Sequence, residues 1–137
     1  MKKMLLLCLL GTLFFIFFAS CSSSSTTAPA IFTLKEPANC YMEALAHGKL
    51  VRDGDYLKLT SFGLELYLVW PYGYSVEMDG STVLVLDESG TVVARTGETI
   101  KLGGGESPQY WVEELIGREI PEDCAGTYWL TSGVIRD

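Results

Sequence analysis

The sequence predicts an all-β fold: a mainly antiparallel small barrel or sandwich, with an OB-like barrel among the alternatives, and one short helix. Two observations carry this prediction. In several runs of four to seven residues, apolar and polar residues alternate with a period of two, as they do in half-buried strands. Glycine-containing turn signals separate these runs every eight to twelve residues, which is typical of antiparallel hairpins.

Four runs show the strand pattern: residues 56–59, 64–70, 83–86 and 100–102. The run 83–86 is apolar throughout and indicates a fully buried strand. A further run at 127–135 predicts the closing strand of the domain. The turn signals are Asp53-Gly54, Phe62-Gly63, Asp79-Gly80, Glu88-Ser89-Gly90 and Thr96-Gly97.

The stretch from 107 to 117 predicts the helix. Ser107 is expected to cap its N-terminus, Pro108 to take the first helical position, and Gly117 to end it. The residues expected on its buried side are Tyr110, Leu115 and Trp111.

The N-terminus has the pattern of an export signal. Lys2 and Lys3 precede an apolar run at 4–18, which is shorter than the roughly 20 residues needed to span a bilayer as a helix. Small residues then lead directly to Cys21. This arrangement resembles the lipobox of bacterial lipoproteins, which implies cleavage before Cys21 and lipid on its thiol. By the same resemblance, the protein is expected in the cell envelope, lipid-anchored and extracytoplasmic, on the outer membrane if the cell has two.

Three segments are therefore expected: a signal peptide at 1–20, a lipidated Ser/Thr/Pro-rich tether at 21–37, and a β-rich globular domain at 38–137. Within the tether, residues 31–34 are apolar enough to dock as an extended segment. Removal of Lys2 and Lys3 leaves eight Lys and Arg against seventeen Asp and Glu, a formal net charge of −9. Such an acidic surface repels nucleic acid, so no nucleic-acid partner is expected.

Two cysteines remain in the expected domain, Cys40 and Cys124, one near each end. In an oxidising compartment they predict a disulfide. Closing a loop of about 85 residues would contribute roughly 4–5 kcal/mol in the chain-entropy model. A metal site is the alternative, but the close-spaced ligand pairs of zinc sites are missing. Neither a metal nor a cofactor is predicted.

Two sequence features suggest a ligand-binding surface. Trp70-Pro71-Tyr72-Gly73-Tyr74 places aromatic rings around a turn, where Tyr72 and Tyr74 could stack on sugars or hold a peptide. Trp70 ends an alternating run, which favours core packing over a place in the binding surface. Gly103-Gly104-Gly105-Glu106 suits a ligand-facing loop, or a strand that bends closely past a neighbour.

No catalytic residues are predicted. The single histidine, His47, is expected to be structural or solvent-facing, and no nucleophile-elbow pattern surrounds a serine. Several acidic pairs occur, but in predicted turns or on the helix, where carboxylates are usually solvated.

Several short motifs follow one another in a distinctive order: Gly48-x-Leu50, Val69-Trp70-Pro71-x-Gly73, Asp79-Gly80 ahead of Val83, Gly90-x-Val92-Val93-Ala94, Gly97, Leu102-Gly103-Gly104-Gly105-Glu106, and Cys124 near Tyr128-Trp129. This order resembles that of a group of small bacterial lipoproteins and secreted proteins, over about residues 48–130. The resemblance implies a compact β-barrel-like domain and supplies no activity or catalytic residue.

Two functional hypotheses follow. The first is a non-enzymatic envelope lipoprotein, held on the membrane by its lipid, that binds an envelope protein, peptide or glycan or serves a structural role. The alternative is a small envelope hydrolase that uses carboxylates near the Gly103–Glu106 loop.

Overall fold

The structure, a computed structural model, describes residues 27–137. The predicted signal peptide, the predicted lipid attachment at Cys21 and the first part of the predicted tether lie outside these residues. The elements in chain order are β1 (Phe32–Thr33), β2 (Ala44–Asp53), β3 (Tyr56–Ser61), β4 (Leu64–Trp70), β5 (Ser75–Asp79), β6 (Thr82–Leu86), β7 (Val92–Arg95), β8 (Thr99–Ser107), α1 (Gln109–Ile116), the 3-10 helix η1 (Glu122–Cys124) and β9 (Thr127–Val134).

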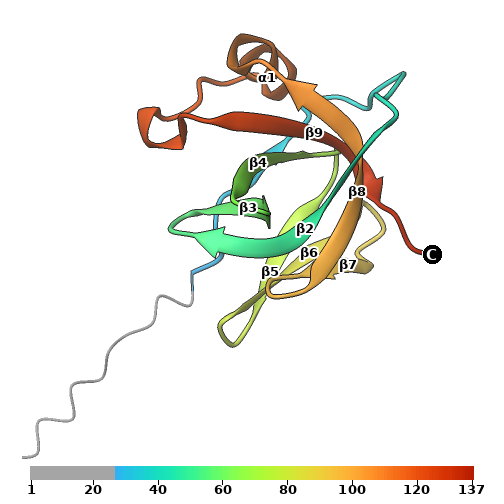
Figure 1. The fold of residues 1–137 in the computed structure, drawn as a ribbon, viewed down its shortest axis with the longest axis vertical. Coiled ribbons are helices and arrows are strands. Elements are labelled where there is room, and N and C mark those ends of the chain that lie inside the picture. Colours follow the sequence, from blue (N-terminus) through green and yellow to red (C-terminus); the bar gives the residue numbers. More distant parts are fainter. Residues whose placement is uncertain (1–26) are drawn as a thin grey trace, which may run out of the picture.

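Five strands close into a barrel, which confirms the predicted fold class (Figure 1). Around the barrel, β3 pairs with β2, β2 with β8, and β8 with β9, all antiparallel. The circle is completed by β4, which pairs antiparallel with β3 and parallel with β9. This circular order, with one parallel pair between the third and fifth barrel strands, is that of an OB barrel. The barrel is thus mainly antiparallel and OB-like, with its helix placed after the fourth barrel strand.

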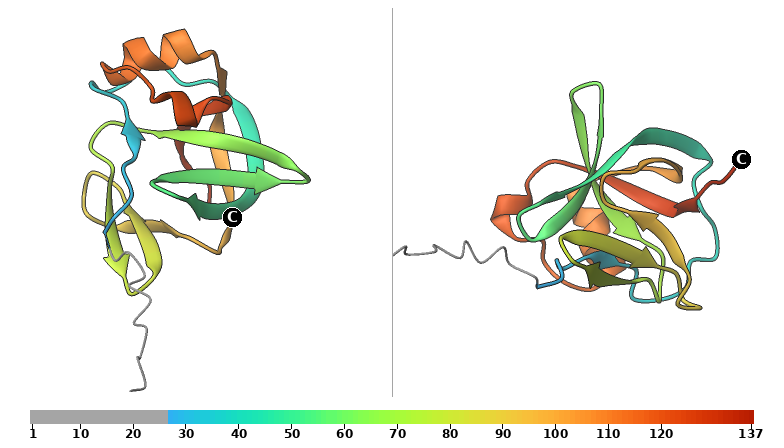
Figure 2. Two further views of the ribbon diagram at one scale, coloured as in Figure 1. Left: turned by 90° about the vertical axis from the view of Figure 1, so that its left-hand side faces the viewer. Right: turned by 90° about the horizontal axis from the view of Figure 1, so that it is seen from below.

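The β5–β7 sheet and α1 cover the two ends of the barrel (Figures 1 and 2). Between β4 and β8 the chain forms a separate antiparallel sheet in the order β5-β6-β7. Figures 1 and 2 show this sheet at one end of the barrel and α1 at the other. The predicted turns at glycines 54, 63, 80, 90 and 97 are confirmed, since each of these residues has a positive φ.

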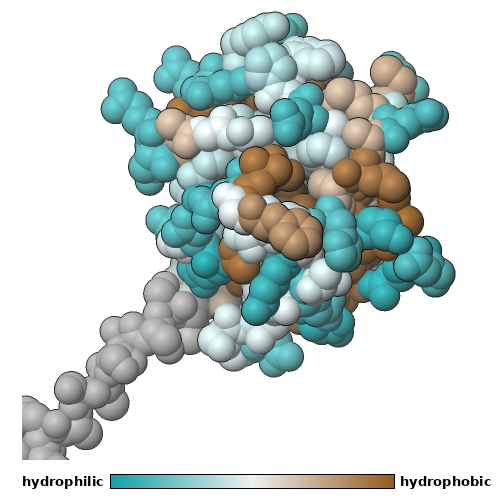
Figure 3. All heavy atoms as spheres, in the orientation of Figure 1, coloured by the Kyte–Doolittle hydropathy of each residue, from teal (hydrophilic) through white to brown (hydrophobic). Residues whose placement is uncertain are grey.

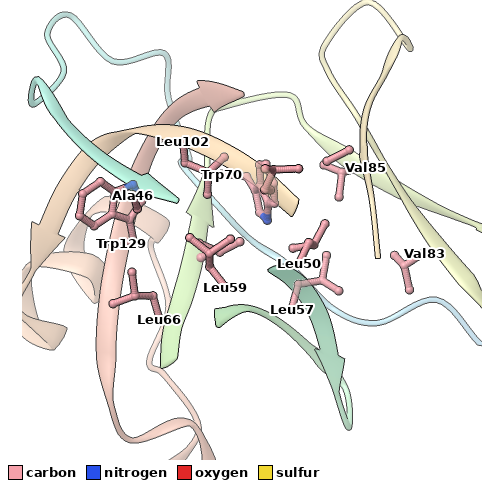
Figure 4. Packing of buried hydrophobic residues seen from close by; sticks show 13 residues of the cluster. Ala46, Leu50, Leu57, Leu59, Leu66, Trp70, Val83, Val85, Leu102 and Trp129 are labelled. Atoms are coloured by element: carbon pink, nitrogen blue, oxygen red, sulfur yellow. The ribbon is translucent and has the colours of Figure 1, made fainter. Parts of the chain in front are cut away.

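The first core fills the barrel (Figure 4). The inward-facing residues of β4 that belong to it are Leu66, Leu68 and Trp70. Val83 and Val85 of the small sheet lie against this core, close to Leu50 and Leu57, so the β5–β7 sheet closes one end of the barrel. Leu64, the first residue of β4, is exposed although it alternates in step with these three, because it lies beside the tip of the β3–β4 hairpin.

A second core lies outside the barrel wall and includes a segment assigned to the tether. Phe32 stacks on Tyr56, with ring centroids 5.2 Å apart, and meets Tyr128 edge-on. Phe32 pairs with Val69 through β1, which runs parallel to β4, and Leu34 donates its backbone N–H to the Trp70 carbonyl. Residues 31–34 therefore dock as an extended segment, and the folded part of the chain extends into the predicted tether.

The helix departs from its expected geometry at one end and on its buried face. Pro108 is its N-terminal cap, and Ser107 is instead a buried residue of β8 whose hydroxyl does not cap the helix. Gly117 ends the helix in the left-handed conformation, as predicted. Val112 and Ile116 are buried and Leu115 is half-buried against the second core, whereas Tyr110 is 75% exposed and Trp111 is 43% exposed. The prediction that these two aromatics are buried was wrong because the helix presents the i, i+4 pair Val112 and Ile116 to the second core, and Tyr110 and Trp111 lie away from that pair.

The predicted disulfide is not formed, and Cys40 and Cys124 are free thiols. Cys124 ends η1 and is fully buried in the second core, where burial raises the pKa of its thiol. Cys40 is exposed. The disulfide does not form because the docked segment places Phe32, and not Cys40, in the core that contains Cys124. Cys40 lies further along the chain, at a surface hollow beside Trp111 and Leu115.

Candidate functional site

Two hollows share the segment 35–42, which connects β1 to β2. The first, here called the apolar groove, has a volume of about 400 Å³. The second, here called the tyrosine pocket, has a volume of about 230 Å³. Both are lined by Pro37 and Tyr41, so they are neighbours on the surface. Together they form the candidate functional site.

The apolar groove lies between the segment 35–42 and α1. The side chains that give it apolar character are Met42, Trp111, Leu115 and Leu130. The exposed thiol of Cys40 also lines it. Exposed Trp111 is the largest side chain of this groove and is presented by a helix that is held by buried Val112 and Ile116. A concave apolar surface with an aromatic residue on a rigid element is typical of binding sites.

The segment 35–42 is fastened at both ends. Lys35 donates its backbone N–H to the Leu115 carbonyl of α1 at 3.0 Å. At the other end Met42 lies on Gly105 of β8 so closely that a Cβ on this glycine would be 2.7 Å from the Met42 sulfur. Gly105 thereby forms part of the wall that holds the groove in place.

The three predicted ligand-facing glycines are buried strand residues. Gly103, Gly104 and Gly105 lie in β8, with an irregularity in the β8–β9 register between Gly103 and Gly104. A Cβ on Gly104 would be 1.9 Å from the carbonyl oxygen of Leu130. Of the two alternatives, the structure therefore has the strand that bends closely past a neighbour. Gly103 and Gly104 permit the contact of β8 with β9, and Gly105 permits the contact with Met42.

The tyrosine pocket brings together two of the predicted aromatic residues. Tyr72 is 46% exposed and Tyr74 is half-buried, and the pocket is completed by Tyr41, which is 43% exposed. Trp70 is fully buried and lies beneath the pocket, where it stacks on Tyr74 with centroids 5.9 Å apart. Burial, and then the charge of Asp87, raises the pKa of the Tyr74 hydroxyl, so this group stays protonated at neutral pH.

One carboxylate lines the tyrosine pocket. Glu88 sits over the backbone of Gly73, where a Cβ would be 3.0 Å from the Glu88 Cβ. Its neighbour Asp87 is engaged by the turn that follows, since Asp87 Oδ1 accepts hydrogen bonds from the Ser89 N–H at 2.9 Å and the Thr91 N–H at 3.0 Å. Within residues 27–137, Glu88 takes part in no ion pair or side-chain hydrogen bond. Its charge is thus available to a ligand.

Glu106 lies elsewhere. It is exposed and lines a separate hollow with Ser107, Gln109 and Thr127. No second carboxylate is among the described residues that line this hollow.

Sequence reasoning missed Tyr41, Met42 and Trp111 as site residues. Tyr41 and Met42 follow Cys40 in a stretch without strand periodicity, so nothing in the sequence tied them to the aromatic cluster at 70–74. Trp111 was assigned to the core. The available signal was the adjacent pair Tyr110-Trp111, because neighbouring residues of a helix lie about 100° apart and only one of them can point to the middle of the buried face.

Other surface features add little to this site. Figure 3 shows one face of the molecule, on which apolar residues stand in separate groups among hydrophilic ones. His47 is exposed on β2.

Among residues 27–137, no three His, Cys, Asp or Glu side chains are grouped so as to hold a metal ion. No helix in the same part of the chain has the length and apolar character needed to cross a membrane.

Comparison of the chain with protein-family models, curated proteins and solved structures finds no match.

Proposed function

We propose that this chain is a lipid-anchored envelope protein whose domain binds an extended segment of another envelope protein. The apolar groove receives an apolar side chain of that segment, and the adjoining tyrosine pocket receives the next part of it. The domain acts by binding rather than by catalysis. The anchor is Cys21, in keeping with the lipobox-like sequence before it.

The observation that carries the proposal is the adjacency of the two hollows. An apolar groove with Trp111 at its side, continuous through Tyr41 with an aromatic pocket, suits an elongated ligand better than a compact one. The segment that separates them is fastened to α1 and β8, so both hollows are preformed. Charge also favours a peptide over nucleic acid, since the chain has a formal net charge of −7.

Replacing the predicted lipid attachment residue tests the anchor. In Cys21→Ser the protein is expected to leave the membrane fraction, because the thiol that carries the acyl chains is missing. The measurement is fractionation of cells followed by immunoblotting. The Cys40→Ser variant is the matched control and is expected to stay in the membrane fraction. Unchanged fractionation of Cys21→Ser would refute the lipid anchor.

Selection of peptides on the full-length protein tests the binding face. From a random heptapeptide display library, the enriched sequences are expected to share an apolar residue, which the apolar groove receives. Trp111→Ala should weaken the binding of a selected peptide by about tenfold or more, because aromatic anchors in grooves carry much of the binding free energy. Tyr110→Ala, on the same helix but outside the groove, should leave the dissociation constant within about twofold, since exposed positions away from the contact contribute little. Equal binding by Trp111→Ala, or no enrichment, would contradict the proposal.

A further inference from the structure

We propose that the tyrosine pocket receives the cationic side chain, lysine or arginine, of the bound segment. This inference rests on the proposed function, because it names the chemistry that one part of the binding face selects. Three properties of the pocket carry it: the aromatic rings, the unpaired carboxylate and the size.

The rings supply cation–π attraction. Tyr41, Tyr72 and Tyr74 line one small hollow, and the ring of Tyr74 is held in place by its stack on buried Trp70. A cation near the face of an aromatic ring is attracted by the ring quadrupole, and the attraction grows when the site is partly desolvated. Tyr74 is half-buried, so part of its ring is already shielded from water.

The carboxylate supplies charge complementarity. Glu88 lies at the same hollow and has no ion-pair partner within the described part of the chain. Lys58, by contrast, is already paired with Asp53 at 2.6 Å, so the protein's own buried cation is neutralised elsewhere. A charge-assisted hydrogen bond to Glu88 would complement the cation–π contacts.

The size favours a single side chain. The pocket encloses about 230 Å³, less than the roughly 300–1,000 Å³ of pockets that enclose whole small molecules. The hydroxyls of Tyr41, Tyr72 and Tyr74 donate to no protein acceptor within residues 27–137, so they are free to contact the ligand. A lysine or arginine side chain fits this combination of rings, one carboxylate and limited space.

The test follows the tyrosine rings by NMR in the full-length protein, labelled with ¹³C-tyrosine and held in non-ionic detergent micelles. The probes are the blocked amides N-acetyl-arginine and N-acetyl-lysine methylamide, with N-acetyl-norleucine methylamide as the neutral analogue of lysine. The basic amides should shift the resonances of Tyr41, Tyr72 and Tyr74 in a saturable manner. Tyr110, exposed on α1 outside the pocket, should not move. The norleucine amide is expected to bind at least about fivefold more weakly.

Matched variants separate the carboxylate from net charge. Glu88→Gln should weaken the binding of the basic amides by about five- to tenfold, since the substitution removes the negative charge and keeps the shape of the side chain. Glu114→Gln makes the same change in net charge on an exposed face of α1 and should leave the binding unchanged.

Equal binding of the norleucine amide, or the absence of any shift at the three tyrosines, would overturn the inference. Tighter binding of tetramethylammonium than of either basic amide would also overturn it, because it would assign the pocket to a quaternary ammonium head group. The two proposals fail separately. If the selected peptides depend on Trp111 but lack a basic residue, the proposed function holds and the inference about the tyrosine pocket fails. If the pocket binds the basic amides but the protein selects no peptide, the inference holds and the proposed function fails.

Discussion

Gly104→Ala is expected to destabilise the domain by about 3 kcal/mol or more, because the added methyl group meets backbone rather than a movable side chain. A Cβ at this position would be 1.9 Å from the Leu130 carbonyl oxygen, and the φ of Gly104 is +135°. Relief of the overlap requires β8 and β9 to separate at the irregularity in their register. This loss is a large fraction of the roughly 5–15 kcal/mol that stabilises a small domain.

Urea unfolding of the full-length protein followed by circular dichroism measures the effect. Gly80→Ala is the matched control, because Gly80 also has a positive φ, +60°, but nothing lies within 4 Å of the new Cβ. Its expected cost is about 1–2 kcal/mol, that of the left-handed conformation alone. Equal losses for the two variants would show that the close approach of β8 to β9 is not required for stability.

Phe32→Ala is expected to lower the free energy of unfolding by about 3–5 kcal/mol, the usual cost of truncating a buried phenylalanine. Phe32 is 2% exposed. Its ring contacts Tyr56 and Tyr128, and the Arg118 guanidinium lies 5.1 Å from the ring centroid. The loss would establish that residues 31–34 belong to the folded domain.

The control for this prediction is Phe62→Ala. Phe62 is fully exposed at the tip of the β3–β4 hairpin, so its removal should change the free energy of unfolding by no more than about 0.5 kcal/mol. Denaturant midpoints of the two variants give the comparison. A Phe32→Ala midpoint indistinguishable from that of Phe62→Ala would mean that β1 does not stabilise the domain.

The fold class could be predicted from the sequence because its signals are local. Period-two runs in β3 and β4, and glycine turns such as Asp79-Gly80, depend only on neighbouring residues. The parallel pairing of β4 with β9 could not be predicted, since it joins segments about sixty residues apart through side chains that alternate like those of any strand. The sequence indicates that residues 31–34 can dock as an extended segment, but the pairing of β1 with β4 could not be predicted because two residues of strand carry no periodicity.

The candidate site was predicted only where its residues are consecutive. Tyr72 and Tyr74 lie on one turn and could be recognised as a pair, whereas Tyr41 reaches them only through the path of the segment 35–42. The glycine triplet was ambiguous because close backbone contact and a ligand-facing loop demand the same residue. The predicted disulfide was wrong for a different reason. Cys40 and Cys124 each lie near one end of the domain in sequence, but the docked residues 31–34 occupy the position beside Cys124.

Site-specific photo-cross-linking in intact cells tests most directly whether this domain binds through the groove and the tyrosine pocket. A benzophenone amino acid is placed at position 72 or 111 of the full-length chain, and at the exposed position 62 as a control. The same protein adduct is expected from positions 72 and 111, and none from position 62. Adducts of equal yield from position 62, or none from either site position, would contradict it.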